Sequence, residues 1–490
     1  MYQEKEQEST LGASWRTLVL PFAIMALGTV LAFLSPAIGG IVVLIGFIWV
    51  VLRSLPLALA VYVIASPFRF GLAFHHHQIA LSDLMAIIMA VRLIFMSGRP
   101  GVRGLWQKFM GTPFWRPVAL LLVLSILSMG VALSHSTTMV KILEYIEFFV
   151  VIVAVARQAG LTEAAWKPVL GALFAISSFL AVIGFYQFLF EVGPKANVVD
   201  HHHVRAEALF GQPNAFGGFE AMVFPLIVTL LAYGPSWARK WWAWVVTALV
   251  ALSVIDSFSR GAWVASMAAV FFMGVVAWVS QGREAINRRF VIPAVILPII
   301  GFVLIDLIGK TNLSHHALLG VISKRTTGGI ISSTFTAVSN PKHHFDTAQR
   351  LLIWKEALRA IKHHPILGVG LGGFHRFVQL NPIPKLLHAP PMAHNLYLEW
   401  GADLGVLGIF TALWLEWSWI RHAAGALMSK ARSLSRFEFA LGLGAFGTMV
   451  SFIVHDWVDF MIDHGVVVPL LLAMAIVWAL VNRGAGRSES

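Results

Sequence analysis

Long apolar runs separated by short polar stretches dominate the chain. A helix needs roughly 20 apolar residues to cross the hydrocarbon core of a bilayer, and about fourteen runs approach that length. They lie near residues 17–34, 37–52, 55–67, 79–96, 116–133, 139–157, 168–190, 214–233, 241–256, 261–280, 290–308, 401–420, 437–454 and 464–482. The second and third are short and closely spaced, so the pattern predicts an all-α polytopic membrane bundle of roughly 12 to 14 spans. The first run is expected to be a span and not a removed leader, because no small-residue cleavage site follows it promptly.

The Lys and Arg residues of the short loops indicate the orientation of this bundle. Cytoplasmic loops of membrane proteins carry an excess of these residues. If there are about fourteen spans, the cation-rich short loops all fall on one side of the membrane, which is therefore expected to be cytoplasmic, with both termini inside. The cations on this side are Arg99, Arg103, Lys108, Arg116, Arg157, Lys167, Arg239, Lys240, Arg283, Arg288, Arg289, Arg421, Lys430, Arg432, Arg436, Arg483 and Arg487.

One connection, residues 309–391, is far longer than the others, and connections of this kind are often functional. It carries ten Lys and Arg residues against two acids, Asp346 and Glu356. From Gln349 its apolar residues recur at helical spacing until Pro365 interrupts the pattern. We therefore expect a basic, partly helical extracytoplasmic loop before the last three spans. The expected parts of the chain are an N-terminal bundle (1–200), helices with outward arginine motifs (201–308), the loop domain (309–400) and C-terminal helices (401–490).

Composition narrows the class of protein further. The 490 residues are 58% hydrophobic and 12% charged, with a mean hydropathy of +0.77. A soluble chain carries about 25% charged residues, so the solvent of this chain is lipid. The absence of cysteine excludes disulfides, thiolate catalysis and cysteine-ligated metals. A net charge of +12 suggests membrane lipids or an anionic substrate as partners, and it does not by itself indicate nucleic acid.

Three residues that are far apart in sequence are expected to meet at the outer face. Arg205 lies in VRAEALFGQPNAFGGF just before a span, Arg260 in DSFSRGAWVA starts another, and His394 in PPMAHNLYLEWGADLGVLG lies where the long loop re-enters the membrane. An arginine at a helix end often only reaches lipid phosphate. However, Arg205 precedes a turn at Pro213 and Asn214, where the free N–H groups of a helix start favour an anion. Two guanidinium groups together hold a pyrophosphate in a way that lysine does not imitate.

His394 is the candidate general base. A single histidine is usually a structural hydrogen-bonding residue, and the chain has 19 of them. His394 differs because it lies beside the basic loop, with Asn395 and Glu399 close enough in sequence to orient its ring. An imidazole has an ordinary pKa of about 6.5, which suits a base that works near neutral pH.

At these residues the sequence resembles the O-antigen ligase and polymerase superfamily of bacterial membrane glycosyltransferases. The motifs that carry the resemblance are FSRGAWVA, RLLIWKEALRAIKHHPILGVGLGGF, HNLYLEWGADLGVLG and, upstream, the R…FGQPNAF segment. Together they span roughly residues 205–410 and occur in the family's order. The first two hundred residues resemble only a generic membrane bundle.

The resemblance implies a metal-independent, inverting transferase of the GT-C type that needs no cofactor. Its donor would be a glycan on undecaprenyl pyrophosphate, and its acceptor a hydroxyl at the outer leaflet of the bacterial inner membrane. His394 would activate the acceptor, while Arg205 and Arg260 would hold the diphosphate. The further residues that the resemblance places at the substrate are Arg350, Asn214, Asn395, Tyr397 and Glu399.

Several alternatives stay open at this stage. The acceptor would be lipid A-core for a ligase, a lipid-linked repeat for a polymerase, or a protein for an O-oligosaccharyltransferase. A transporter is a different class, since charges such as Lys141 and Glu144 fall within apolar runs. These two are spaced i, i+3 and so can neutralise each other, and the chain lacks the two corresponding halves typical of transporters.

Three further motifs are given structural interpretations. The run Gly368-x-Gly370-x-Gly372-Gly373 follows no predicted strand, so we expect a flexible hinge and not a dinucleotide loop. The triplets His75–His77 and His201–His203 lack a carboxylate cluster at ligand spacing, so no metal is expected. The acidic segment from His455 to His464 is expected to cap helices or to meet the basic loop electrostatically, with a bound cation as the alternative.

Overall fold

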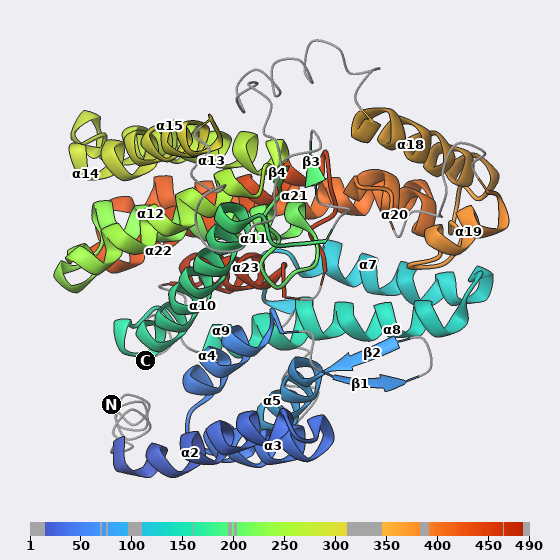
Figure 1. Cartoon of the computed structure of the whole chain (residues 1–490), viewed down its shortest axis with the longest axis horizontal. Coiled ribbons are helices and arrows are strands. Elements are labelled where there is room, and N and C mark those ends of the chain that lie inside the picture. The colour runs from blue at the N-terminus through green and yellow to red at the C-terminus, as the bar shows by residue number, and fades with distance from the viewer. Residues whose placement is uncertain are drawn as a thin grey trace.

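The computed structural model describes residues 15–68, 71–74, 77–96, 110–158, 160–194, 198–199, 203–310, 345–382, 392–463 and 465–483. Within these ranges the chain is almost entirely helical, as the apolar pattern predicts (Figure 1). The exceptions that the described ranges contain are two short antiparallel hairpins: β1 (Gly71–Phe74) with β2 (His77–Ala80), and β3 (Val198–Val199) with β4 (His203–Val204). Residues 311–344 of the basic loop and most of both histidine triplets lie outside the described residues.

Every predicted apolar run coincides with a helix or with consecutive helices. In the first half of the chain these are α2 (Trp15–Ala32), α3 (Pro36–Arg53), α4 (Leu55–Ala65), α5 (Leu81–Met96), α7 (Trp115–Ser128), α8 (His135–Ile146), α9 (Val153–Gln158) and α10 (Glu163–Phe190). In the second half they are α11 (Pro213–Tyr233), α12 (Trp241–Asp256), α13 (Arg260–Gln281), α14 (Arg288–Val291), α15 (Leu297–Lys310), α21 (Val406–Lys430), α22 (Arg436–Asp456) and α23 (Val468–Val481). π-Helical turns connect α8 to α9 and α14 to α15.

Among the described residues, six helices are long and apolar enough to cross a membrane: α3, α10, α11, α13, α22 and the continuous helix Arg288–Ile305. Five shorter apolar helices accompany them. Large apolar side chains are turned outward, as Phe271 and Val279 of α13 illustrate with exposed fractions of 64% and 65%. Such surface is stable against lipid and not against water. The protein is therefore a multi-pass membrane protein, and the larger count of about fourteen spans stays a prediction.

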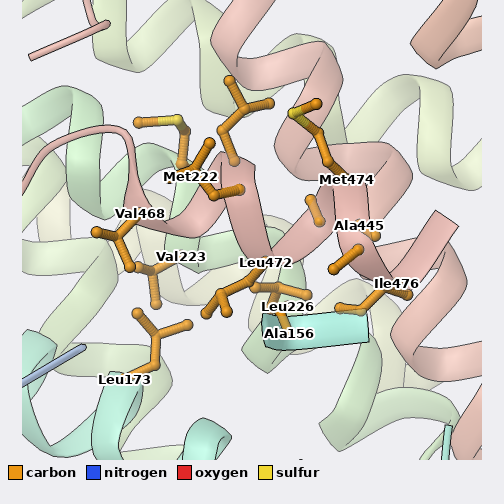
Figure 2. Packing of buried hydrophobic residues seen from close by; sticks show 14 of the residues in the cluster. Ala156, Leu173, Met222, Val223, Leu226, Ala445, Val468, Leu472, Met474 and Ile476 are labelled. Carbon is orange, nitrogen blue, oxygen red and sulfur yellow. The ribbon is translucent and has the colours of Figure 1, made fainter. Parts of the chain in front are cut away.

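The centre of the bundle is formed by α11, α22 and α23, which are apolar on all sides and buried on nearly all of them (Figure 2). Glycines allow the helices to approach closely. A Cβ atom on Gly444 of α22 would lie 2.9 Å from the Cα of Leu226 in α11, and one on Gly447 would lie 2.7 Å from the Cβ of Pro225. Small residues at such crossings are typical of helix packing in membranes.

Three of the long helices, α11, α13 and α22, run between the same two ends of the bundle and pack along one another. Asn214, Arg260 and His455 lie at one end, while Tyr233 and Arg436 lie at the other. A helix of 21 residues rises about 30 Å, which equals the thickness of the hydrocarbon core. The two ends of these helices therefore lie at opposite surfaces of the membrane.

The basic loop and the residues that follow it form a small folded unit at the first of these ends. It contains α18 (Phe345–His363), α19 (Phe374–Leu380) and α20 (Leu396–Leu404), which lie together at the right of Figure 1. The unit has an apolar core of its own, built from Ile353, Ala357, Ala360, Val369, Phe374, Phe377, Val378, Ala393 and Ala402. The predicted helix from Gln349 to Pro365 is thus confirmed, and it begins at Phe345.

The glycine run between α18 and α19 is a docked loop and not the flexible hinge that its composition suggested. Gly368, Gly370 and Gly372 all have positive φ. The carboxylate of Asp403 accepts the backbone N–H groups of Gly372 (2.6 Å) and Phe374 (3.0 Å). The glycines therefore supply left-handed backbone and close approach, so the prediction of a hinge was wrong.

Substitution of Gly368 tests this tight fit. A Cβ atom there would lie 2.2 Å from the carbonyl carbon of Asp403, at a φ of +63°. We expect Gly368→Ala to lower the thermal unfolding temperature of the detergent-solubilised protein, because left-handed strain alone costs about 1–3 kcal/mol. Gly425→Ala in α21 is the matched control, since no atom lies within 4 Å of its added Cβ. Equal unfolding temperatures for the two variants would contradict the docked loop.

The predicted continuous span 401–420 was wrong at its N-terminal end, where two separate helices meet. α20 ends at Leu404 and α21 begins at Val406, with Gly405 between them at φ +73°. A Cβ atom on Gly405 would lie 2.4 Å from the carbonyl oxygen of Pro365, at the end of α18. The close approach of the loop unit therefore interrupts an apolar run that reads as continuous in sequence.

Candidate active site

His394 lies immediately before α20, on the end of the bundle that carries the loop unit. Its Nδ1 atom is 2.8 Å from Oδ1 of Asp459, which follows α22 in the chain. Because a carboxylate only accepts hydrogen bonds, Nδ1–H is the donor and Nε2 is left as the basic nitrogen. The backbone of His394 is left-handed, with φ +52°, a conformation that costs a non-glycine residue about 1–3 kcal/mol and that tends to occur at functional sites.

Asp459 is the centre of a buried polar network, with an exposed fraction of only 1%. Its Oδ2 atom accepts a hydrogen bond from Nδ2 of Asn214 (2.6 Å) and lies 3.4 Å from Nη2 of Arg350. Nη1 of Arg350 donates to the backbone carbonyl of Val458. Burial alone would raise the pKa of the Asp459 carboxyl, but the charge and hydrogen bond of His394, followed by the charge of Arg350, lower this pKa well below its ordinary value.

Arg205 joins the same network through Asn214. Its Nη2 atom donates to Oδ1 of Asn214 (2.5 Å), and its Nε donates to the carbonyl of Ser257 (3.1 Å). Asn214 lies in the first turn of α11, after Pro213 at the first helical position. A continuous chain of hydrogen bonds therefore runs from His394 through Asp459 and Asn214 to Arg205. His394 and Arg205 thus lie in one network, as the sequence predicted.

Arg260 is the first residue of α13, three residues after Ser257. Ser259 caps this helix and its hydroxyl lies 3.3 Å from Nε2 of the buried His455, which fixes the start of α13 against α22. Within the part of the chain that the structure describes, the guanidinium group of Arg260 has no hydrogen-bond or ion-pair partner, and the residue is half-buried. The turn from Ser257 to Arg260 thus connects this cation to Arg205, although no hydrogen bond links it directly to His394.

The residues that follow His394 have their polar atoms occupied within the protein. Asn395 caps α20 with its carbonyl oxygen and donates to the carbonyl of Trp457 (2.7 Å). The hydroxyl of Tyr397 lies 2.8 Å from a carboxylate oxygen of Glu416, and Glu399 accepts the backbone N–H of Ala393. These contacts fix the backbone on both sides of His394. Contact of Asn395, Tyr397 and Glu399 with a substrate stays a prediction.

Left-handed residues occur in each of the three segments that build the site. Besides His394, these are Ala208, between Arg205 and α11, and Phe258, between Ser257 and Arg260. Non-glycine residues adopt this conformation only where the surrounding structure enforces it. The three segments are therefore held in defined shapes by the bundle.

Asp459 is the site residue that sequence reasoning did not assign. The acidic segment after α22 was expected to meet the basic loop electrostatically, and the pair formed by Asp459 and Arg350 confirms this. Within the described ranges no group of three or more His, Cys, Asp or Glu side chains is arranged to hold a metal ion. The sequence offered one indication of Asp459. The predicted order of the spans places it on the same side of the membrane as His394.

Comparisons with known proteins find similarity in the part of the chain that includes several of these residues. Residues 245–413 match the family model described as O-antigen ligase, and this segment contains Arg260, Arg350 and His394. The chain is also 25% identical over 251 residues to a general O-oligosaccharyltransferase of Acinetobacter baylyi. This match covers 50% of the chain and 41% of the relative, so the chain spans less than half of that protein's length. The segment 245–413 is therefore similar to the O-antigen ligase family.

Proposed function

We propose that the protein is a membrane glycosyltransferase that moves a glycan from undecaprenyl pyrophosphate to a hydroxyl group at the outer leaflet. The observation that carries this proposal is the chain of hydrogen bonds that joins a histidine base, through Asp459 and Asn214, to Arg205 in the segment before α11. A base next to a fixed cation is what transfer from a diphosphate leaving group requires. The match to O-antigen ligases supports the same reaction class.

In the proposed reaction, Nε2 of His394 takes the proton of the acceptor hydroxyl. The acceptor oxygen attacks the anomeric carbon of the donor glycan and forms the new glycosidic bond. The bond from that carbon to the pyrophosphate oxygen breaks, its electron pair stays on the pyrophosphate, and the configuration at the carbon inverts. The carboxylate of Asp459 stabilises the imidazolium that forms, since their atoms lie 2.8 Å apart.

Arg205 and Arg260 are proposed to hold the pyrophosphate. Negative charge grows on this group as the bond to the sugar breaks, so cations that are already in place lower the barrier. Arg205 is fixed by Ser257 and Asn214, and Arg260 by its position as the first residue of α13. The first turns of α11 and α13 add free backbone N–H groups, which also favour an anion.

The site is proposed to face the periplasm. The opposite ends of α11, α13 and α22 carry the arginines of the short loops, Arg239, Arg288 and Arg289 among them, and such loops are typically cytoplasmic. The last helix, α23, ends on that same side, because Lys430 donates to the carbonyls of Leu480 and Val481. These contacts support a cytoplasmic C-terminus. The bacterial inner membrane, about fourteen spans and a cytoplasmic N-terminus complete the proposed topology.

A lipid A-core acceptor is proposed first, since the matching family is that of O-antigen ligases. A protein acceptor is the second candidate, which the similarity to a general O-oligosaccharyltransferase favours. A polymerase that joins lipid-linked repeats uses the same chemistry. An ion-coupled transporter has less support, because the intramembrane charges of Lys141 and Glu144 form a pair at 2.7 Å, as their spacing predicted.

The proposed function is tested with purified protein in detergent and an undecaprenyl-pyrophosphate-linked glycan. Lipid A-core, a lipid-linked repeat and an acceptor protein are supplied in separate reactions, and product size is resolved on a gel. We expect product with one acceptor class and unchanged turnover with EDTA. No product with any acceptor would overturn the proposal, and strong inhibition by EDTA would overturn the metal-independent mechanism.

Arg260→Lys tests the grip on the pyrophosphate. Lysine keeps the charge but not the planar fork, so we expect a loss of about 100-fold in kcat, as for removal of one transition-state donor. Arg359→Lys on α18 is the control, because Arg359 is half exposed and pairs only with Glu356 among the described residues. If Arg260→Lys is as active as this control, Arg260 is a lipid-facing cation and not part of the site.

A further inference from the structure

A pocket of about 440 Å³ opens at the end of the bundle opposite to His394. It lies where α11 ends, α13 ends, and α14 and α22 begin, a region at the left of Figure 1 near the label of α14. Its lining residues are Ala232, Tyr233, Arg239, Gln281, Asn287, Arg288, Arg289, Leu434, Ser435, Arg436 and Phe439. Neither the proposed reaction nor the family resemblance uses this pocket.

Four arginines surround the pocket: Arg239, Arg288, Arg289 and Arg436. In the described part of the chain, none of their guanidinium groups has a hydrogen-bond or ion-pair partner, and Nε of Arg239 is buried without one. Burial lowers the pKa of Arg239, and the nearby charges of Arg289 and Arg436 lower it further. Arg289 and Arg436 are therefore close enough to repel Arg239, and an anion between these three groups would relieve the repulsion.

Among the residues that the structure describes, no acidic side chain fills this role. Glu438, in the first turn of α22, accepts the backbone N–H of Ser435 at 2.7 Å and pairs with Arg483 at 2.9 Å. Glu284 lies in the turn between α13 and α14 and is exposed, and it does not line the pocket. The positive charge of the pocket is thus available to a ligand.

Part of the pocket wall is apolar. Ala232, Leu434 and Phe439 line it, and Tyr233 lies across it with its hydroxyl bonded to the carbonyl of Ala285 at 2.8 Å. A site that combines an apolar wall with a cationic rim matches the junction between the headgroup and the acyl chains of a phospholipid. A small free anion would contact only the cationic rim and would not need the apolar wall.

We propose that this pocket binds the phosphate of an anionic phospholipid. Helices α11, α13 and α22 place it about 30 Å from the His394 site, at the other surface of the membrane. Anionic headgroups are abundant at the cytoplasmic surface, which is where the proposed topology places this pocket. Arginine forks around a pocket bind phosphate oxygens in bidentate fashion. The bound lipid would fix the ends of three helices whose other ends form the proposed active site.

The experiment measures binding of phosphatidylglycerol to the full chain in neutral detergent by native mass spectrometry. The test variant replaces Arg289 and Arg436, both exposed, by glutamine, and the control replaces Arg283 and Arg432, which are exposed on the same side outside the pocket. We expect about 25-fold weaker binding for the test variant, given about fivefold for each of the two arginines near a lipid phosphate. Wild type and control should bind alike.

Two further ligands distinguish the source of the phosphate. Phosphatidylcholine, which has no net charge, and glycerol phosphate, which has no acyl chains, should both bind at least tenfold more weakly than phosphatidylglycerol, a difference of about 1.4 kcal/mol. Equal binding of phosphatidylglycerol to the test and control variants would overturn the proposal. So would equal binding of glycerol phosphate or of phosphatidylcholine to the wild type. Circular dichroism and gel filtration check that both variants are folded.

Discussion

His394→Ala is expected to abolish glycan transfer while leaving the protein folded. The imidazole is the proposed base, and a positioned base contributes about 100- to 10,000-fold to the rate. Nothing else in the network can replace it, because Asp459 is enclosed by Asn214 and Arg350 and has an exposed fraction of 1%. The loss should appear in kcat more than in KM, since the base acts on the acceptor proton and not on the pyrophosphate.

The measurement is single-turnover transfer from the lipid-linked donor, with unfolding temperature as the test of folding. His363→Ala is the control, because His363 is exposed at the end of α18 and lies outside the network. Full activity of His394→Ala in a folded protein would remove the base from the mechanism, even if the arginines still bind the donor. The proposed phospholipid pocket would be unaffected by that result.

Asp459→Asn is the second change for which we expect a large effect. Asparagine has the same shape but no charge, so it neither fixes the Nδ1–H form of His394 nor stabilises the imidazolium. Replacement of the carboxylate in a comparable histidine–aspartate pair lowers kcat by about 10,000-fold, and we expect a loss of about 100-fold or more. The amide of the new asparagine would also face the donors of Asn214 and Arg350, which removes their acceptor.

The pH dependence separates this role from a purely structural one. The lowered pKa of Asp459 means that its carboxylate contributes stability above its ordinary pKa of about 3.9, and that this stability is lost only as the pH falls through the lower, folded pKa. Asp459 is therefore ionised at every pH at which activity is measured. In Asp459→Asn the acidic limb of the pH–rate profile should move to lower pH, because the imidazolium loses its neighbouring negative charge.

Glu356→Gln is the control for Asp459→Asn, since Glu356 lies on α18 with Arg350 but pairs with Arg359. An Asp459→Asn protein that is slow but keeps the wild-type pH profile would show that Asp459 supports only the structure. A profile that moves in the expected direction, in a folded protein, supports its action through His394.

The sequence predicts the helices well, because runs such as 241–256 are long enough for a bilayer and have no competing pattern. It also predicts that His394 and Arg205 meet, since the order of the spans places both on one face. The interruption at Gly405 could not be predicted, because its cause is the approach of Pro365, a tertiary contact. The role of Asp459 was missed for the same reason: its hydrogen bond with His394 joins loops that are 65 residues apart.

Tyr397 shows a second limit of reading a site from sequence. Its place in the HNLYLE motif suggested contact with the substrate, but α20 turns its hydroxyl toward Glu416 of α21. Motif spacing indicates which residues are near His394 along the chain and does not indicate the side to which each one faces. Arg260 was placed correctly at the start of a helix, whereas its lack of a partner among the described residues could be seen only in the structure.

The two bonds of Arg350 interlock the outer unit with the proposed base. Arg350 belongs to α18, while its partners Asp459 and Val458 belong to the loop between α22 and α23. If α18 were to swing outward and admit a bulky glycan, both bonds would break, and the carboxylate that orients His394 would lose one of its partners. A protein with its outer unit open would thus hold its base less firmly, and the imidazole would regain its fixed orientation only once that unit closed over its cargo.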